Sequence, residues 1–130
     1  MLFRSGTNWN VVGGAQDSGW VTIANGALSN SWVNNTGAGG AMAMAYRKVG
    51  NRVTMIGGIN DGASAAAAFT LPAGYRPQQA IQGAPSIGSG EGSVFPAQIN
   101  VSTAGVVTFF YPVGATGTPM FFDGFSFLTD

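Results

Sequence analysis

The clearest pattern in the chain is a strict alternation of apolar and polar positions late in the sequence. Four apolar residues alternate with polar or proline positions, namely Phe95, Ala97, Ile99 and Val101 against Pro96, Gln98, Asn100 and Ser102. Successive side chains of a strand point to opposite faces, so this pattern predicts a strand with one buried face. Pro96 cannot donate to a strand ladder and is expected on a sheet edge or facing outward.

Short strands separated by turn residues are predicted along most of the remaining chain. We expect them at 20–24, 41–49, 52–56, 106–111 and 120–128. Gly50-Asn51 predicts a two-residue hairpin between the second and third of these strands. In the last strand, Phe121, Phe125 and Phe127 share one face, and Asp123-Gly124 predicts a bulge.

These elements predict an all-β fold of one domain. Short strands with turns every 8–12 residues are typical of an antiparallel β-sandwich or jelly-roll-like barrel with Greek-key connections. The alanine-rich stretch 63–68 is too short to stand as a helix. Residues 1–18 are expected to be an irregular lead-in, or the stub of a shaft or linker, and residues 19–130 to form the domain.

The charge content changes the picture of the surface. Lys, Arg, Asp and Glu make up 8% of the chain, against about 25% in a typical protein. A surface with so few charges predicts that part of it is covered by other subunits. The net charge of zero argues against nucleic acid as a partner, and no apolar run is long enough to insert into a membrane.

The side-chain inventory disfavours catalysis. The chain has no His and no Cys, so the commonest general base and the thiolate nucleophile are missing. We therefore expect a non-enzymatic protein without cofactor or metal. Two alternatives stay open: a carboxylate pair that cleaves glycans, and a calcium site at Asn60-Asp61.

Aromatic and amide side chains are the candidate ligand contacts. Trp20 opens an alternating strand and is expected in the core, whereas Trp32 stands among Asn and Ser residues. Neutral amides beside an aromatic ring suit sugar hydroxyls, which need donors and acceptors without net charge. The candidate glycan-binding residues, all expected near loops, are Trp32, Asn34, Asn35, Asn60, Asp61, Glu91 and Asp123. The alternative for the tryptophans is packing in the core or at an interface.

Four of the five cations, Arg47, Lys48, Arg52 and Arg76, are expected to converge if the strands pair as predicted. Structural pairing with Asp or with backbone carbonyls is the favoured interpretation of this cluster. The alternative is a site for an anionic substituent of a glycan, such as a phosphate.

Two strings of the sequence resemble a known signature. Residues 46–50 read YRKVG and residues 71–77 read LPAGYRP. In this order and spacing they resemble the C-terminal head domains of bacteriophage tail-fibre and baseplate receptor-binding proteins. The likeness extends over about residues 20–128. It departs from the family pattern at Ala27, where the family has Trp, so the hairpin there is expected to be longer.

The resemblance implies a homotrimeric β-sandwich head that attaches the virion to a host cell-surface saccharide. It also implies partners among the other tail or baseplate proteins, and a location at the tail tip. The chain shows no export signal and no cysteines, which fits a virion part made in the host cytoplasm that acts outside the cell. The signature belongs to the scaffold, so no receptor-contact residue is carried over from it.

Other functions remain open at this stage. The chain could be a trimerising cap or decoration domain of a fibre that binds no ligand, or a polysaccharide depolymerase. A trimeric β head of the tumour-necrosis-factor or C1q kind is a further structural alternative.

Overall fold

The computed structural model describes residues 2–5, 8–11, 16–36, 42–88, 94–111 and 119–129. The strands are β1 (Leu2–Ser5), β2 (Asn8–Val11), β3 (Val21–Thr22), β4 (Val33–Asn34), β5 (Ala45–Val49), β6 (Arg52–Ile56), β7 (Gly58–Asn60), β8 (Ala67–Thr70), β9 (Ile81–Gly83), β10 (Ser86–Gly88), β11 (Val94–Pro96), β12 (Gln98–Val101), β13 (Val106–Phe110), β14 (Met120–Phe121) and β15 (Phe125–Leu128). A single 3-10 turn, η1 (Asn25–Ala27), accompanies them. Within the described residues, no helix is long and apolar enough to cross a membrane.

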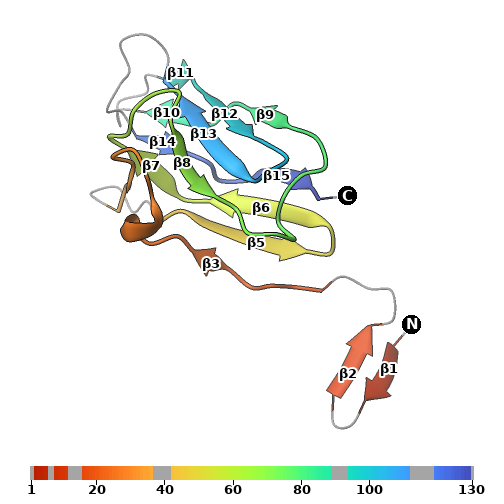
Figure 1. Ribbon diagram of the computed structural model, residues 1–130. Helices are drawn as coiled ribbons and strands as arrows, with labels where there is room; N and C mark the ends of the chain where they lie inside the picture. Colours follow the sequence, from red (N-terminus) through yellow and green to blue (C-terminus); the bar gives the residue numbers. More distant parts are fainter. Residues whose placement is uncertain are drawn as a thin grey trace.

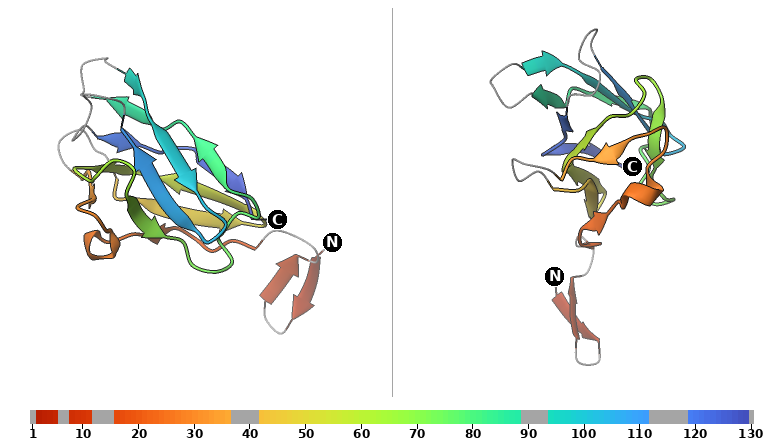
Figure 2. Two further views of the ribbon diagram at one scale, coloured as in Figure 1. Left: turned by 45° about the horizontal axis from the view of Figure 1, so that its top comes forward. Right: turned by 90° about the vertical axis from the view of Figure 1, so that its left-hand side faces the viewer.

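The strands form an antiparallel sandwich, as the sequence predicts. One sheet has the order β8-β13-β12-β9 and faces a second with the order β15-β6-β5-β3 (Figure 1). A third sheet, β11-β10-β14-β7-β4, continues the second (Figure 2). β1 and β2 pair only with each other, so the expected irregular lead-in contains a two-stranded hairpin. The division between lead-in and domain stays a prediction.

Two strands turn a corner between the second and third sheets. β6 passes into β7 at Gly57, and β14 passes into β15 through Asp123 and Gly124. Gly57 has a φ of 101°, and a Cβ there would stand 2.5 Å from the carbonyl oxygen of Ala43, so only glycine fits. The Gly57 N–H donates to Asp123 Oδ1 at 2.9 Å, which ties the two corners together.

This corner corrects the prediction for residues 120–128. They form two strands in different sheets and not one strand with a bulge. Gly124 has a φ of 86°, so the Asp123-Gly124 dipeptide is a turn. Met120 and Phe122, which alternation places away from Phe121, are the fully buried members of this segment.

Four aromatic side chains form a continuous row of ring contacts in the core. The Trp32 ring stacks on Tyr111 at 5.4 Å and meets Phe109 edge-on at 5.3 Å. Phe109 in turn stacks on Phe122 at 4.6 Å. Aromatic pairs at these separations add to the free energy gained from burial. Residues from all three sheets therefore close over one continuous core.

Several local predictions are confirmed. Ala97, Ile99 and Val101 are buried, while Gln98 and Asn100 are only half-buried. β11, which holds Pro96, is an edge strand, where a missing N–H is tolerated. β5 and β6 pair from Val49 opposite Arg52, which makes Gly50-Asn51 a two-residue hairpin loop.

The segment 71–80 makes the Greek-key connection. β8 and β9 follow each other in the chain but lie at opposite edges of their sheet, so this segment crosses the sheet end. Leu71 is fully buried, and Gly74 has a φ of 89°, as a turn at LPAGYRP requires. Arg76 Nε donates to the Leu71 carbonyl at 2.8 Å and closes the turn.

Two expectations for the N-terminal half are wrong. Trp20 is 45% exposed, because β3 is an edge strand that begins only at Val21. No hairpin follows Asn25-Gly26 either. The chain makes the turn η1 there and then enters β4, which pairs with β7 in the third sheet.

The packing of Trp32 on Gly62 gives a test of the core. A Cβ on Gly62 would lie 1.8 Å from the indole, so Gly62→Ala forces the ring to move. We expect a loss of about 1–3 kcal/mol in the free energy of unfolding, the usual cost of overpacking. Gly26→Ala is the matched control, since nothing lies within 4 Å of a Cβ there. Urea unfolding of both variants measures the difference, and equal stabilities would contradict the packing.

Candidate functional site

Most of the predicted ligand residues come together in space. β4 pairs with β7, with Val33 opposite Asn60 and Asn34 opposite Ile59. Five of the seven candidates, Trp32, Asn34, Asn35, Asn60 and Asp61, therefore lie on these two strands or directly beside them. Glu91 lies outside the described residues.

Two of these residues are engaged in structure. Trp32 is 1% exposed, and its indole N–H points to the Ala66 carbonyl, so its ring packs in the core and not against a ligand. The Asn34 amide donates to the Ile23 carbonyl at 2.7 Å and accepts from the Met44 N–H at 2.8 Å. Its side chain thus joins three segments of the chain.

The backbone around Trp32 is strained at four positions. Asn30, Ser31, Asp61 and Ala65 have φ values of 55° to 65°, which residues other than glycine seldom adopt. Asn30 Nδ2 donates to the Ala67 carbonyl at 2.7 Å, and the Ala65 N–H donates to the Phe109 carbonyl at 2.9 Å. These bonds hold two loops against each other and over the indole. The free energy gained from this packing offsets the cost of the strained backbone.

Asn60 and Asp61 keep polar groups that the fold does not use. Asn60 Oδ1 is buried and has no hydrogen-bond partner among the described residues. Asp61 is exposed, and within the same part of the chain its carboxylate accepts no hydrogen bond. Asn35 is half-buried and bonds through its backbone to Gly58. Of the predicted group, the exposed Asp61 carboxylate and the half-buried Asn35 are therefore left for a ligand, whereas Asn60 Oδ1 is covered by the fold.

Asp123 does not join the patch. Its carboxylate accepts the Gly57 N–H at the corner between the sheets, so its role in the structure is to hold that corner. The sequence signal for this role was present, because Asp followed by Gly is a turn dipeptide.

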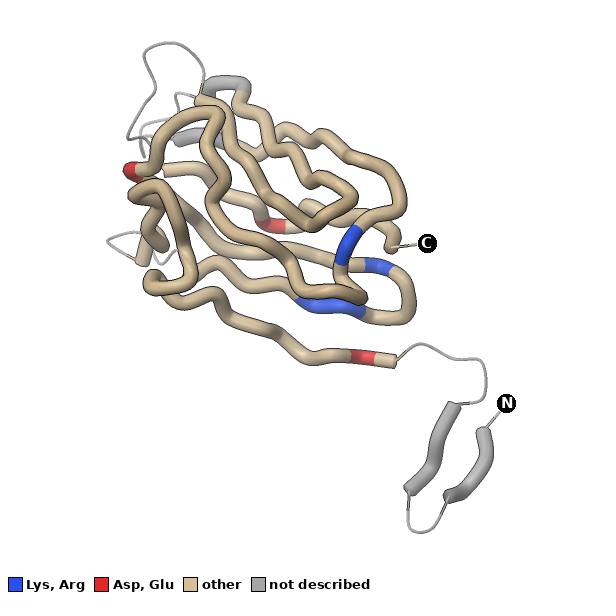
Figure 3. The backbone as a smooth tube through the Cα atoms, viewed as in Figure 1, with Lys and Arg blue, Asp and Glu red and all other residues tan. Residues whose placement is uncertain are grey.

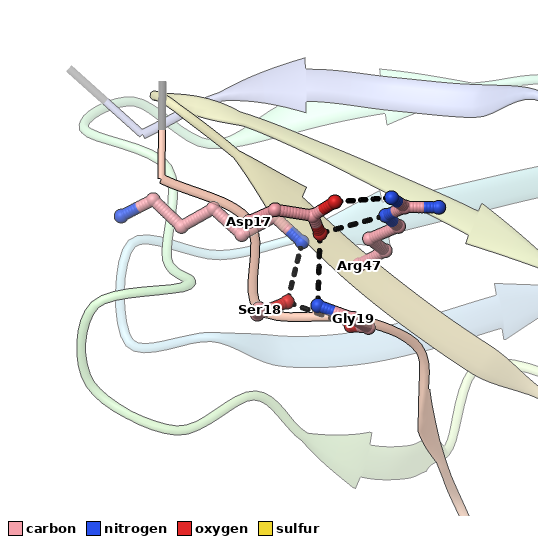
Figure 4. A network of polar contacts seen from close by, with 5 residues as sticks. Asp17, Ser18, Gly19 and Arg47 are labelled. Atoms are coloured by element: carbon pink, nitrogen blue, oxygen red, sulfur yellow. Dashed lines mark hydrogen bonds and ion pairs between the residues drawn. The ribbon is translucent and has the colours of Figure 1, made fainter. Parts of the chain in front are cut away.

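The cations coloured in Figure 3 gather at the end of the sandwich that carries the β5–β6 hairpin, whereas the coloured acidic residues are scattered. Arg47 pairs with Asp17 through both carboxylate oxygens (Figure 4). The Arg47 guanidinium also lies 5.7 Å from the centre of the Trp20 ring. Lys48 Nζ donates to the Gly74 carbonyl at 2.6 Å and lies over Tyr75. The structure therefore uses Arg47, Lys48 and Arg76 in structural pairing, which the sequence analysis favoured.

The Asp17–Arg47 pair shifts the pKa of both groups. The hydrogen bond from Arg47, supported by the Gly19 N–H, lowers the pKa of Asp17 from 3.8 to about 2. The same bond raises the pKa of Arg47. Beside the pair, Gln16, Ser18, Lys48 and Tyr75 help to line a groove of about 330 Å³. Ser18 Oγ is also engaged, since it accepts the Lys48 N–H at 2.9 Å.

A second groove lies between the free edges of the two facing sheets. β9 ends one sheet and β15 ends the other, and the groove between them has a volume of about 410 Å³. It is lined by Pro77, Gln78, Gln79, Ile81, Gln82, Phe125, Ser126, Phe127 and Leu128. This groove was not predicted from the sequence, although three of the chain's five glutamines stand between positions 78 and 82.

One solved structure has a fold similar to that of this chain. The chain superposes on the crystal structure of the receptor binding protein (gp15) of Listeria phage PSA with a TM-score of 0.67 and 22% sequence identity. The match covers 90% of this chain and 67% of that one. No protein-family model matches the chain, and a search of curated proteins finds no match either. At this identity the likeness establishes a shared fold.

The Asp17–Arg47 pair predicts an acid-sensitive step in stability. A carboxylate whose pKa is lower in the folded than in the unfolded chain stabilises above pH 3.8, and that stabilisation is lost as the pH falls towards 2. Between pH 5 and pH 2 we expect the parent chain to lose more stability than Asp17→Asn, which cannot titrate there. Chemical unfolding at both pH values measures the losses, with Asp61→Asn as the unpaired control. Equal losses in the parent and Asp17→Asn would count against the pair.

Proposed function

We propose that this chain is the receptor-binding head of a bacteriophage tail fibre or baseplate, and that it attaches the virion to a saccharide on the host cell. The likeness to the Listeria phage receptor binding protein over nine-tenths of the chain carries the proposal. The YRKVG and LPAGYRP strings support it, because both fall on elements that build this fold: the strand β5 and the Greek-key connection.

The surface chemistry favours a saccharide as the receptor. Sugars are recognised by neutral donors and acceptors, and the chain has few charges and many amide and hydroxyl side chains. Four of its five cations are Arg47, Lys48, Arg52 and Arg76, and each makes a hydrogen bond within the fold. These bonds within the fold already use part of the donor capacity of each cation.

Attachment without cleavage is the favoured mode. Glycan hydrolysis in most enzymes needs two carboxyl groups about 5–10 Å apart, one of them an acid with a raised pKa. Asp17 is paired with Arg47 and has a lowered pKa, and Asp123 holds the Gly57 corner. These engagements leave Asp61 as the free acid among the described carboxylates.

Threefold assembly is part of the proposal. Val49 and Leu128 are 41% and 46% exposed and flank Arg52 in register across three neighbouring strands, so all three point from the same face. Trp20 adds a further exposed apolar surface. A second and third copy of the chain would cover such area, as subunit interfaces commonly do.

Binding is tested with fluorescently labelled chain on a glycan array and on a panel of bacterial cells. We expect binding to a defined set of saccharides, competition by the same saccharide in solution, and no new reducing ends after incubation. Absence of binding to every glycan and every cell would overturn the proposed function. Release of reducing ends would replace attachment with depolymerisation.

The assembly is tested by light scattering coupled to size-exclusion chromatography. We expect a mass three times the 13.2 kDa of one chain at micromolar concentration, with dissociation on dilution. A stable single copy over the whole concentration range would contradict the trimer, whatever the outcome of the binding assay.

A further inference from the structure

The described grooves differ in whether their polar side chains are available to a ligand. In the groove beside Asp17, the carboxylate, the Ser18 hydroxyl and the Lys48 ammonium all make hydrogen bonds within the fold. In a groove on the outer face of β9, β12 and β13, Asn100 Oδ1 accepts from Gln98 at 2.7 Å, and Ser102 accepts the Val106 N–H at 3.1 Å. Gln82 borders this groove as well as the one between β9 and β15.

The groove between the edges of β9 and β15 is different. Gln78, Gln79 and Gln82 are exposed, and their amides make no hydrogen bond within the part of the chain that the structure describes. Each amide offers one acceptor and two donor hydrogens. Three such groups therefore border one hollow of about 410 Å³ without a structural task that occupies them.

The floor of this groove is apolar and firmly held. Phe125 reaches from β15 to the opposite sheet, where a Cβ on Gly83 would lie 2.1 Å from its ring. Phe127 packs beside it with ring centres 6.2 Å apart. The fold itself therefore provides packing partners for both rings of the floor.

The chemistry of the lining selects a class of ligand. Among the described residues, no Lys, Arg, Asp or Glu lines the groove. A sugar ring has one face of C–H groups, which packs on an aromatic or aliphatic surface, and an edge of hydroxyls, which exchange hydrogen bonds with amides. The volume falls in the usual range for small-ligand sites, about 300–1,000 Å³. The cation beside the lining, Arg52, already donates to the Ser126 hydroxyl at 3.0 Å, so the lining residues themselves offer an anionic sugar no charge of opposite sign.

We propose that the groove between β9 and β15 binds an uncharged sugar unit, with the apolar floor under its C–H face and Gln78, Gln79 and Gln82 on its hydroxyl edge. This inference rests on the proposed function and gives the saccharide a site. The proposed sugar contact is distinct from the Asn60–Asp61 patch, which lies at the end of β7 in the third sheet.

The test combines binding and spectroscopy on the full chain. Gln78→Ala, Gln79→Ala and Gln82→Ala remove one amide each from exposed positions, so the fold is retained, and thermal unfolding checks this. A net hydrogen bond of about 0.5–1.5 kcal/mol corresponds to a loss of about 2- to 10-fold in affinity for each variant. Gln16→Ala is the matched control, because it removes an exposed glutamine amide from the other groove.

The probes are glucose, galactose, rhamnose and N-acetylglucosamine as uncharged sugars, with sialyllactose and glycerol phosphate as anionic ones. In ¹⁵N–¹H spectra we expect the side-chain amide signals of the three glutamines to shift with an uncharged sugar and to stay unchanged with the anionic probes. Shifts confined to residues around Asn60, or a preference for the anionic probes, would overturn the site.

The outcomes separate this inference from the proposed function. If the parent chain binds cells and all three variants bind equally well, the function stands and the groove is wrong. If the parent binds no cell and no glycan, the function itself fails. If the variants no longer form the trimer but still bind the saccharide, the groove is a contact between copies and the inference is overturned.

Discussion

The fold depends on the corner between the second and third sheets, which is held by the hydrogen bond from the Gly57 N–H to the Asp123 carboxylate. At this point two strands leave one sheet and enter another, and each is bonded to its neighbour on both sides of the turn. The Phe122 N–H also donates to the Gly57 carbonyl, and the Gly124 N–H donates to the Met55 carbonyl. With the corner closed, Phe122 enters the core on one side, and β15 runs along the sandwich edge on the other.

The position of β15 explains why the sandwich has a groove at one edge. β15 and β9 end their sheets, so no strand bonds across the gap between them. Phe125 fills the bottom of this gap against Gly83, where the absence of a side chain allows the ring to approach. The top of the gap is left to side chains of the segment that leads into β9, and these are glutamines. The corner thus sets the path of β15. This path in turn places Phe125 against Gly83 and leaves the glutamine amides along the edge of the groove.

The sequence predicts the strands better than the site, and the reason is physical. Alternation reports burial directly, so the buried positions of 97–101 are predicted correctly. The turn dipeptide Gly50-Asn51 likewise predicts its hairpin correctly. Alternation cannot report that a strand changes sheet, and residues 120–128 are therefore mistaken for one element. Trp32 shows the same limit for the site: its polar neighbours suggest exposure, but the loops that they form close over the ring. The glutamines at 78–82 carry no pattern that distinguishes a groove rim from an ordinary surface.

The scarcity of charged residues is directly connected with the proposed mode of binding. An uncharged site gains only about 1 kcal/mol from each hydrogen bond, because water offers the sugar equal partners. A dissociation constant in the millimolar range corresponds to about −4 kcal/mol, which a few such hydrogen bonds would supply to the proposed groove. Such binding is useful only when several copies act together, since linked sites engage a second sugar at high effective concentration. The proposed head would therefore gain from assembly in two ways: its exposed apolar side chains would be covered, and its weak sites would be repeated.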